Sequence, residues 1–232
     1  MSGLALSIIM PVLNEVATIE ATLMALSPFH ARGVELIVVD GGSNDKTMTL
    51  AEPLVDQVLS APRGRAAQMN CGAAAARGNV LLFLHADTRL PDDADTLIRD
   101  GLVQSGRVWG RFDVRFNAGG LFFLIAALMN LRSRLTGIST GDQAIFVTRA
   151  AFESAGGFPP IALMEDIALS ARLKRISRPL CLRACVTTSA RRWRTRGVLR
   201  TVFLMWRLRL AYFLGADPAQ LARRYGYARA ER

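Results

Sequence analysis

Short apolar runs alternate with segments of helical spacing along the first 105 residues. Runs of this kind, too short for a helix and rich in β-formers, are typical of strands buried on both faces of a parallel sheet. The predicted strands are 6–12, 34–40, 56–60 and 80–84, and the predicted helices are 17–26, 66–77 and one that begins near Pro91. This alternation predicts an α/β fold with a mostly parallel, doubly wound sheet.

The second half of the chain has a different pattern. Residues 108–116 alternate between apolar and polar side chains, which predicts a strand with one exposed face. Further strands are predicted at 144–148 and 178–187, and helices at 121–131, 164–176 and 198–214. The apolar run at 121–131 is well short of the roughly 20 residues that a helix needs to span a bilayer. We therefore expect one compact domain with a helical tail.

Polar side chains follow three of the predicted parallel strands, at the point where each strand ends. Asn14 and Glu15 follow the first strand, Asp40 ends the second, and His85 and Asp87 follow the fourth. Open α/β sheets bind ligands at this edge. Such groups suit a nucleobase and ribose, and a single loop carboxylate suits a divalent cation that bridges phosphates. The pattern predicts a nucleoside diphosphate site, although Asp40 also fits a turn residue and Asn14 a helix cap.

Arg63, Gly64 and Arg65 offer cationic groups and an open backbone just before a predicted helix, which suits phosphate. The first strand is followed by neither a G-x-G-x-x-G motif nor a Walker loop, which argues against dinucleotide-dependent dehydrogenases and ATPases. A nucleotidyltransferase on a similar sheet is a second hypothesis. It would need a glycine-rich loop with a basic residue after the first strand, where this chain has Pro-Val-Leu-Asn-Glu at 11–15.

The net charge of +10 is concentrated at the carboxyl end. Residues 191–232 hold eleven arginines against Asp217 and Glu231, which is a net +9. A basic tail can bind nucleic acid, phosphate-rich ligands or an anionic membrane, so a non-catalytic binding module is a third hypothesis. The helix at 198–214, which carries Trp206, fits either a basic amphipathic helix on a membrane or a helix packed on the sheet.

The cysteine count and the amino terminus bear on the compartment. Three cysteines are an odd number, which argues against a disulfide framework and fits a reducing environment. Cys181 and Cys185 have no other cysteine or histidine nearby, which is a poor zinc pattern. The amino terminus lacks the features of a signal peptide. We expect a cytoplasmic protein that can associate with the inner face of the membrane.

Six motifs in order and register carry a family resemblance. They are SIIMPVLNE, ELIVVDGGSNDKT, RGRAAQMNCGA, VLLFLHADT, GDQAIFVTR and GGFPPIALMEDIALSARL. Together they closely resemble the family 2 glycosyltransferases with the GT-A fold, over roughly residues 4–176. The His-Ala-Asp-Thr variant and the RRWRTRG tail look most like the bacterial subfamily labelled radical-SAM/selenodomain-associated transferase 2, sometimes linked to arsenosugar biosynthesis.

The resemblance implies an inverting transfer of a sugar from a nucleoside diphosphate sugar to a hydroxyl group. A UDP-sugar is the favoured donor, the acceptor is an unidentified small molecule or lipid, and no nucleic acid is expected. The GT-A domain would span residues 1–190, with a nucleotide-binding half at 1–105 and an acceptor half at 106–190. Residues 191–232 would form a basic helical tail packed on the domain or on a membrane.

Residue roles follow from the matching positions. The nucleotide would be held by Pro11, Asn14, Glu15, Asp40, Arg63, Gly64, Arg65 and His85. His85 stands where the family has the first Asp of its Asp-x-Asp motif, and Asp87 would ligate Mg²⁺ or Mn²⁺ as the second. Asp166 would be the general base, and Gly141, Asp142, Gln143 and Glu165 would line the acceptor side. The alternative for Glu165 and Asp166 is a structural role at a helix amino terminus.

Overall fold

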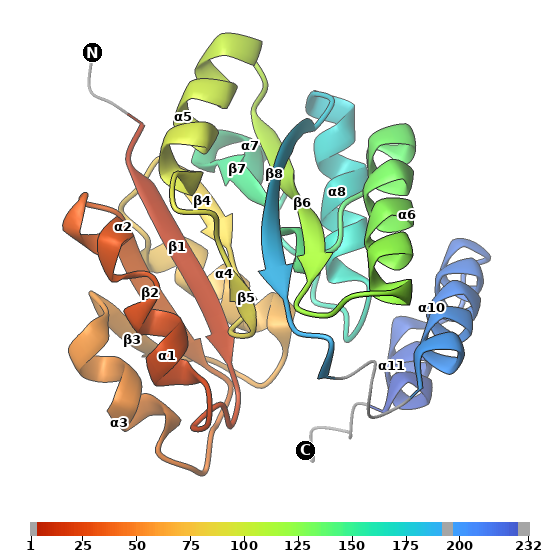
Figure 1. The fold of residues 1–232 in the computed structure, drawn as a ribbon, viewed down its shortest axis with the longest axis horizontal. Helices are drawn as coiled ribbons and strands as arrows, with labels where there is room; N and C mark the ends of the chain where they lie inside the picture. The colour runs from red at the N-terminus through yellow and green to blue at the C-terminus, as the bar shows by residue number, and fades with distance from the viewer. Residues whose placement is uncertain (1–3, 192–196, 227–232) are drawn as a thin grey trace.

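The computed structural model describes residues 4–191 and 197–226 (Figure 1). Most of the RRWRTRG stretch, residues 192–196, lies outside the described residues. The strands are β1 (Leu6–Val12), β2 (Glu35–Asp40), β3 (Gln57–Ser60), β4 (Val80–Phe83), β5 (Thr88–Arg89), β6 (Trp109–Phe116), β7 (Phe146–Thr148) and β8 (Leu180–Thr188). They form one eight-stranded sheet in the order β3-β2-β1-β4-β7-β6-β8-β5.

Helices lie before, between and after these strands. The α-helices are α1 (Ile19–Met24), α2 (Ser27–Ala31), α3 (Thr47–Ala51), α4 (Arg65–Ala75), α5 (Ala94–Ser105), α6 (Leu121–Thr136), α7 (Arg149–Ser154), α8 (Glu165–Ile176), α10 (Val198–Phe213) and α11 (Pro218–Tyr225). Two 3₁₀ turns are η1 (Glu52–Leu54) and η2 (Gly141–Gln143). The predicted helix at 17–26 corresponds to the shorter α1, and the unpredicted α2 follows it with Pro28 in its first turn, where proline is tolerated.

The sheet is parallel in its first half and mixed in its second. Strand β1 pairs in parallel with β2 and β4, and β2 pairs in parallel with β3. Strand β7 is antiparallel to both β4 and β6, while β6 and β8 are again parallel. The short β5 pairs antiparallel with β8 at the far edge of the sheet. The predicted parallel arrangement is therefore found for β1 to β4. Strand β7, which lies between β4 and β6 and runs antiparallel to both, makes the sheet mixed.

Two apolar cores lie on opposite faces of the sheet. Because successive side chains of a strand point to opposite faces, Ile8 and Met10 of β1 join one core and Ile9 joins the other. The first core is covered by α1, α2, α3 and α5, and the second by α4, α7 and α8. Both faces of β1 and β4 are therefore buried, which leaves only the ends of these strands free to carry polar groups.

Strand β6 corrects one prediction. The alternation at 108–116 predicts an exposed face, but within β6 only Arg115 is exposed. Arg111 is fully buried and forms an ion pair with Asp113, which also pairs with Arg134 of α6. A polar position in an alternating strand can face a covered side when its charge is paired there. Helix α6 supplies that cover.

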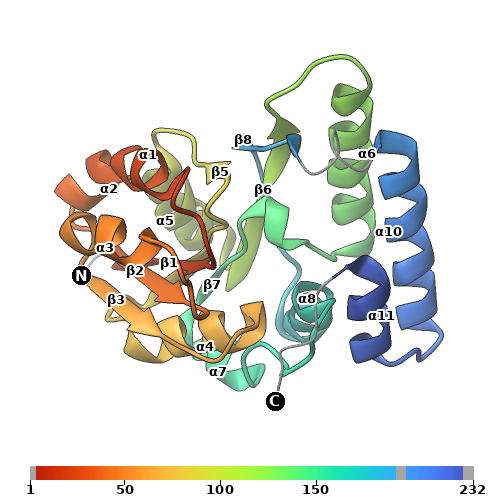
Figure 2. The same cartoon turned by 90° about the horizontal axis from the view of Figure 1, so that it is seen from below.

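The tail packs on the second half of the protein. Val198 and Val202 of α10 lie against a cluster that contains Phe122 and Ile125 of α6. Leu208 of α10 shares a second cluster with residues from α11 and from the segment that leads into α8. Figure 2 shows α11 between α8 and α10. No helix among residues 4–191 and 197–226 is long and apolar enough to cross a membrane.

Candidate active site

One cavity of about 920 Å³ lies where the ends of β1 and β4, the start of α8 and the tail helices meet. From the first half of the chain it is lined by residues that include Pro11, Glu15, Arg63, Gly64, Arg65, His85 and Asp87. From the second half it is lined by Gly141, Asp142, Glu165 and Asp166, and from the tail by Arg191, Met205, Arg209, Arg223 and Tyr225 among others. The structure thus brings together most of the site residues that the sequence predicts.

Asn14 and Asp40 are not among the lining residues of this cavity. The carboxylate of Asp40 accepts hydrogen bonds from the backbone N–H groups of Gly42 and Ser43, both at 2.9 Å. Asn14 has a φ of 54°. Its backbone N–H donates to the Ser43 hydroxyl, and its side-chain oxygen accepts from the backbone of Asn44. Asn14 thus links the loops after β1 and β2, Asp40 shapes the loop after β2, and the nucleotide contacts of both stay a prediction.

The segment from Arg63 to Arg65 leads into α4 at the edge of the cavity. Gly64 has a φ of +143°, a conformation that side-chain-bearing residues rarely adopt. One turn further along α4, the Gln68 side chain donates to the carbonyl oxygens of Val12 and Val39, each at 2.8 Å. This clamp fixes the amino end of α4 against the ends of β1 and β2.

His85, Ala86 and Asp87 form the turn between β4 and β5. Asp87 is exposed to the cavity, and its Oδ1 lies 3.4 Å from the hydroxyl of Thr88. Nowhere in the described part of the chain do three His, Cys, Asp or Glu side chains gather closely enough to hold a metal ion by themselves. An exposed single carboxylate still fits Mg²⁺ or Mn²⁺, because such ions commonly take their remaining ligands from phosphates and water.

The His85 ring packs against the loop at Gly141. Its Nδ1 lies 3.5 Å from Oδ1 of Asp142. A Cβ atom added at Gly141 would come within 2.5 Å of the ring, so a side chain there would displace the histidine. Gln143 is fully buried and its side chain accepts from the backbone of Thr140, so it shapes this loop and does not line the cavity. The turn after β4 and the predicted acceptor loop are therefore in direct contact.

Glu165 and Asp166 begin α8 after a strained residue. Met164 is buried and has a φ of +71°, which costs free energy in a side chain of this size. Asp166 Oδ2 accepts from the backbone N–H of Gly141 at 2.8 Å, and its Oδ1 accepts from that of Ile167 at 2.7 Å. The carboxylate therefore has a defined position beside the loop at Gly141. Asp166 thus has the structural role at the start of a helix that was the alternative for this residue, and it lines the cavity as well.

Glu165 has a different environment from its neighbour. Its side chain is only 5% exposed. Burial, joined by the adjacent charge of Asp166, raises the pKa of Glu165 to about 7, and the positive charge of Arg65 opposes the rise. A carboxyl group in this range can hold or release a proton near neutral pH, which is a common property of acid–base sites.

The tail residues in the cavity were missed by the sequence analysis. Asp217 caps α11, with Pro218 at its first position and Gly226 after its end, and these signals are sufficient to predict that helix. No comparable signal marks Arg209, which stands between Leu208 and Leu210 and has the same local setting as the exposed Arg207. Its place in the cavity depends on how α10 packs.

Comparison with known proteins identifies the family. The model of glycosyl transferase family 2 matches residues 7–151. A PGL/p-HBAD biosynthesis glycosyltransferase of Mycobacterium bovis is 34% identical over 167 residues, which cover 66% of this chain and 62% of that protein. This chain therefore spans about three fifths of the length of that relative.

Solved structures agree at the level of the fold. The TarS fragment 1–349 of S. aureus in complex with UDP has a TM-score of 0.66 at 18% identity, with 80% of this chain and 60% of that chain covered. A mannosyltransferase of Pyrobaculum calidifontis in complex with GDP-Man and Mn²⁺ has a TM-score of 0.63 at 20% identity, with 96% and 69% covered. The resemblance inferred from the six motifs is thus confirmed: the chain belongs to glycosyl transferase family 2 and has the GT-A fold.

Proposed function

We propose that this protein transfers a sugar from a nucleoside diphosphate sugar, with a UDP-sugar as the favoured donor, to a hydroxyl acceptor with inversion. One observation carries the proposal. Asp87 from the β4–β5 turn and Asp166 from the start of α8 line the same cavity, together with the two arginines that flank Gly64. A single chamber thus holds a metal-type carboxylate, cationic groups for phosphate and a base-type carboxylate.

On the donor side, Arg63 and Arg65 would contact the diphosphate and Asp87 would ligate Mg²⁺ or Mn²⁺. When bound, such an ion neutralises the charge that develops on the leaving diphosphate. Pro11 and Glu15 would contact the nucleoside from the end of β1, and His85 would contact the nucleotide from the turn after β4. Solved structures of the same fold contain UDP alone, UDP with Mg²⁺, or GDP-Man with Mn²⁺, which supports this class of donor.

On the acceptor side, Asp166 would remove the proton from the acceptor hydroxyl. The oxygen would form a bond to the anomeric carbon as the bond to the diphosphate breaks, and the nucleoside diphosphate would leave with the electron pair. A single displacement of this kind inverts the anomeric configuration and needs only one base. The backbone N–H of Gly141, which donates to Asp166, keeps the carboxylate in place. Asp142 and Glu165 would line the acceptor.

Substitution of Asp166 tests the base. Asp166→Asn keeps the size of the side chain but cannot accept the proton, so we expect a loss of transfer of at least about a hundredfold with donor affinity unchanged. Products are followed by mass spectrometry with a panel of UDP- and GDP-sugars and Mn²⁺, and UDP affinity by titration calorimetry. Asp100→Asn, an exposed position on α5, is the control. Full transfer by Asp166→Asn would rule out this assignment.

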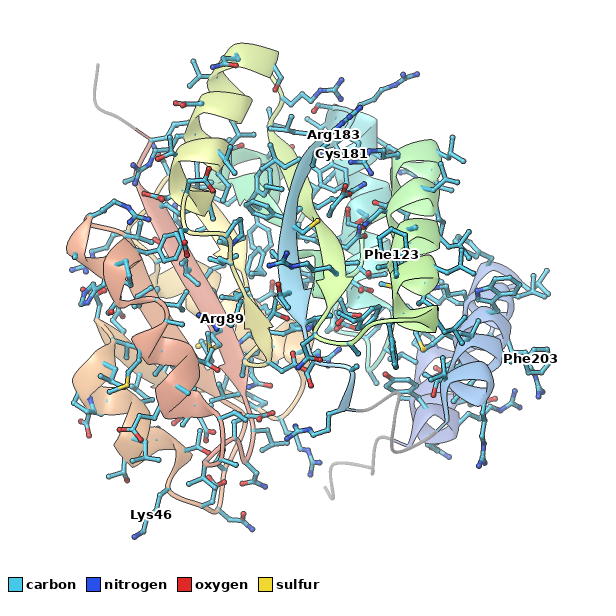
Figure 3. All side chains as sticks on the ribbon, viewed as in Figure 1. Lys46, Arg89, Phe123, Cys181, Arg183 and Phe203 are labelled. Atoms are coloured by element: carbon cyan, nitrogen blue, oxygen red, sulfur yellow. The ribbon has the colours of Figure 1, made fainter. Side chains whose placement is uncertain are left out.

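We further propose that α10 lies on an anionic membrane. Phe203, Trp206, Leu210 and Phe213 are between 61% and 67% exposed and recur at the spacing of one helical face. Figure 3 shows Phe203 at the outer side of α10, away from the sheet. Arg200 and Arg207 are exposed on the same helix. Aromatic and leucine side chains with arginines beside them suit the interface of an anionic bilayer.

Vesicle flotation tests this surface. The wild type is expected to float with phosphatidylglycerol vesicles and to stay in solution with phosphatidylcholine. The double variant Trp206→Ser, Leu210→Ser should lose most of the binding, because it removes apolar contacts and keeps every arginine. If light scattering instead shows a dimer that the double variant abolishes, the face is an interface between two copies and the membrane proposal is wrong.

A further inference from the structure

We infer that the acceptor carries an anionic group, a phosphate or a carboxylate, that binds to Arg209 at the tail side of the cavity. This inference rests on the proposed function, because it names the class of molecule that Asp166 would activate. It concerns the part of the cavity lined by α10 and α11, away from the ends of β1 and β4.

Arg209 is a cation that reaches the cavity from α10 while most of its side chain is covered. It lines the cavity, and its Nε is buried with no hydrogen-bond partner among the described residues. Burial lowers the pKa of Arg209, and the negative charges of Asp166 and Asp142 oppose that shift. The guanidinium therefore lies in the field of the predicted base and of the acceptor loop.

Arg132 of α6 places a second guanidinium in the same region. Its Nε and Nη2 are also buried without a hydrogen-bond partner in the described part of the chain. Burial lowers the pKa of Arg132 to about 10, the positive charge of Arg209 lowers it further, and Asp166 acts in the opposite direction. Two like charges thus lie near each other, next to one carboxylate.

The neighbouring carboxylate does not satisfy these groups. Both oxygens of Asp166 accept from backbone N–H groups, and within residues 4–191 and 197–226 no hydrogen bond or ion pair joins it to Arg132 or Arg209. Guanidinium nitrogens buried without a partner are costly, and a bound anion that accepts hydrogen bonds from them would remove that cost. The planar guanidinium fork matches the oxygen geometry of phosphate and carboxylate. The arrangement is therefore that of an anion site.

The anion belongs to the acceptor and not to the donor for a reason of position. The donor diphosphate would have its own cationic partners in Arg63 and Arg65, which line the cavity just before and at the start of α4. Arg209 instead lies within the influence of Asp166, whose carboxylate must contact the acceptor hydroxyl. Arg191 and Arg223 line the same cavity and are exposed, so they add positive potential along the approach of an anionic molecule.

The anion can be part of a free metabolite or of a lipid headgroup, since both present the same oxygen atoms. The test therefore uses two kinds of probe on the full-length protein with UDP and Mn²⁺ present at saturation. Calorimetry measures the binding of glycerol 3-phosphate, with glycerol as the neutral match. A second calorimetric titration uses dihexanoyl phosphatidylglycerol below its micelle concentration, so that the exposed face of α10 has no bilayer to bind, with dihexanoyl phosphatidylcholine as the neutral match.

The variant is Arg209→Gln and its matched control is Arg224→Gln, an exposed arginine of α11 that does not line the cavity. Each removes one positive charge from the tail. We expect glycerol 3-phosphate or phosphatidylglycerol to bind the wild type and Arg224→Gln alike, and Arg209→Gln at least about tenfold more weakly. The neutral probes should not bind. Arg209→Lys keeps the charge without the planar guanidinium, so its affinity for the anionic probe should lie between those of the wild type and Arg209→Gln. Thermal melting checks that each variant is folded.

Three outcomes would overturn the inference. Equal binding by Arg209→Gln and Arg224→Gln would mean that only the net charge of the tail matters. Competition between the anion and UDP, or a loss of UDP affinity in Arg209→Gln, would assign Arg209 to the donor. Binding of UDP with no binding of either anionic probe would contradict this inference alone, whereas a wild type that binds no nucleotide would contradict the proposed function and this inference with it.

Discussion

Two adjacent carboxyl groups at the start of α8 differ because of what surrounds each of them. Both line the cavity, but Glu165 is only 5% exposed, whereas Asp166 is half-buried and accepts two backbone hydrogen bonds. Pairs of acidic residues whose environments separate their protonation behaviour are common where acid–base chemistry occurs. Because the pKa of Glu165 is raised in the folded protein, the free energy of unfolding should depend on pH through this group, which can be measured without a substrate.

Substituting Glu165 should change how stability depends on pH. Its pKa is about 7 in the folded protein against 4.5 as the ordinary value, so the folded state keeps this proton to higher pH than the unfolded state. The free energy of unfolding of the wild type should therefore fall as pH rises from about 4.5 to 7, by at most about 3 kcal/mol from this group. Glu165→Gln should lack that component.

Urea unfolding at several pH values measures the effect. The difference in unfolding free energy between Glu165→Gln and the wild type should grow in favour of the variant as pH rises through this range. Glu20→Gln, an exposed position on α1, should run parallel to the wild type at every pH. A constant difference for Glu165→Gln would mean that this carboxyl group titrates normally.

Asp87 is expected to act through the metal ion alone. Asp87→Ala removes the exposed carboxylate of the β4–β5 turn, so the increase in UDP affinity caused by Mn²⁺ should drop at least about tenfold while metal-free UDP binding changes little. Calorimetric titrations with Mn²⁺ and with a chelator compare the two states. Asp100→Ala is the control, and an intact metal response in Asp87→Ala would remove this residue from the metal site.

At the scale of elements, a buried carboxylate holds the parallel half of the sheet together. Glu35 at the start of β2 accepts from the hydroxyl of Ser7 in β1, the side chain of Gln57 in β3, and both the backbone and side chain of Arg77 before β4. Burial raises the pKa of Glu35, but the hydrogen bonds and the charge of Arg77 outweigh it, so the pKa is lowered overall. One side chain thus links the segments that carry the strand ends of the site.

Removing this charge should loosen those strands. Glu35→Gln leaves donors of three elements facing a neutral amide, so we expect a loss of about 2 kcal/mol in the free energy of unfolding at pH 7. Because the pKa of Glu35 is lowered in the folded state, the difference from the wild type should shrink as pH falls below about 4.5. Urea denaturation measures both. Glu52→Gln, exposed in η1, should match the wild type, and an equally stable Glu35→Gln would show that the link is unimportant.

At the scale of the whole molecule, the tail lines the cavity and packs against the segment that carries the proposed base, Asp166. Leu208 of α10 is 2% exposed and packs in one cluster with Met164 and Ile167, the residues that flank the Glu165–Asp166 pair. The strained backbone at Met164 depends on such packing to persist. Residues of α10 and of the start of α8, both far in sequence from β1, therefore pack together and fix where Asp166 lies.

Shortening Leu208 should affect transfer and leave donor binding intact. Leu208→Ala opens a space in this cluster, so we expect about 2–4 kcal/mol of lost stability and a reduced kcat, because the start of α8 is held less firmly. The UDP affinity should stay within about twofold, since the ends of β1 and β4 are untouched. Thermal melting, calorimetry and turnover assays separate the effects. Leu214→Ala, 79% exposed after the end of α10, is the control, and a fall in UDP affinity in Leu208→Ala would contradict this division.

Local patterns were sufficient for the first half of the fold. Apolar runs with polar ends predict β1, β2 and β4 closely, because a strand buried on both faces admits few other sequences. The predictions were weaker where a charged side chain is buried with a partner, because the alternation of polar and apolar residues then no longer marks an exposed face. Strand β6 was expected to have an exposed face, but its buried Arg111 is compensated by Asp113. Helix α7 and the two-residue β5 were missed, since they are short and are stabilised by tertiary contacts.

The sequence by itself determined the family, the parallel half of the sheet and the identity of the carboxylates that meet at the cavity. It could do so because strand period, turn chemistry and motif order are local properties. Only the tertiary structure decided that the basic tail lines that cavity, that Asn14 links two loops and Asp40 shapes one of them, and that Glu165 is buried while Asp166 is not. Arg132 and Arg209 lie 77 positions apart, and their guanidinium nitrogens become buried without a hydrogen-bond partner among the described residues only through the packing of α6 and α10. Burial and charge pairing depend on all neighbours of a side chain at once, and no local pattern encodes them.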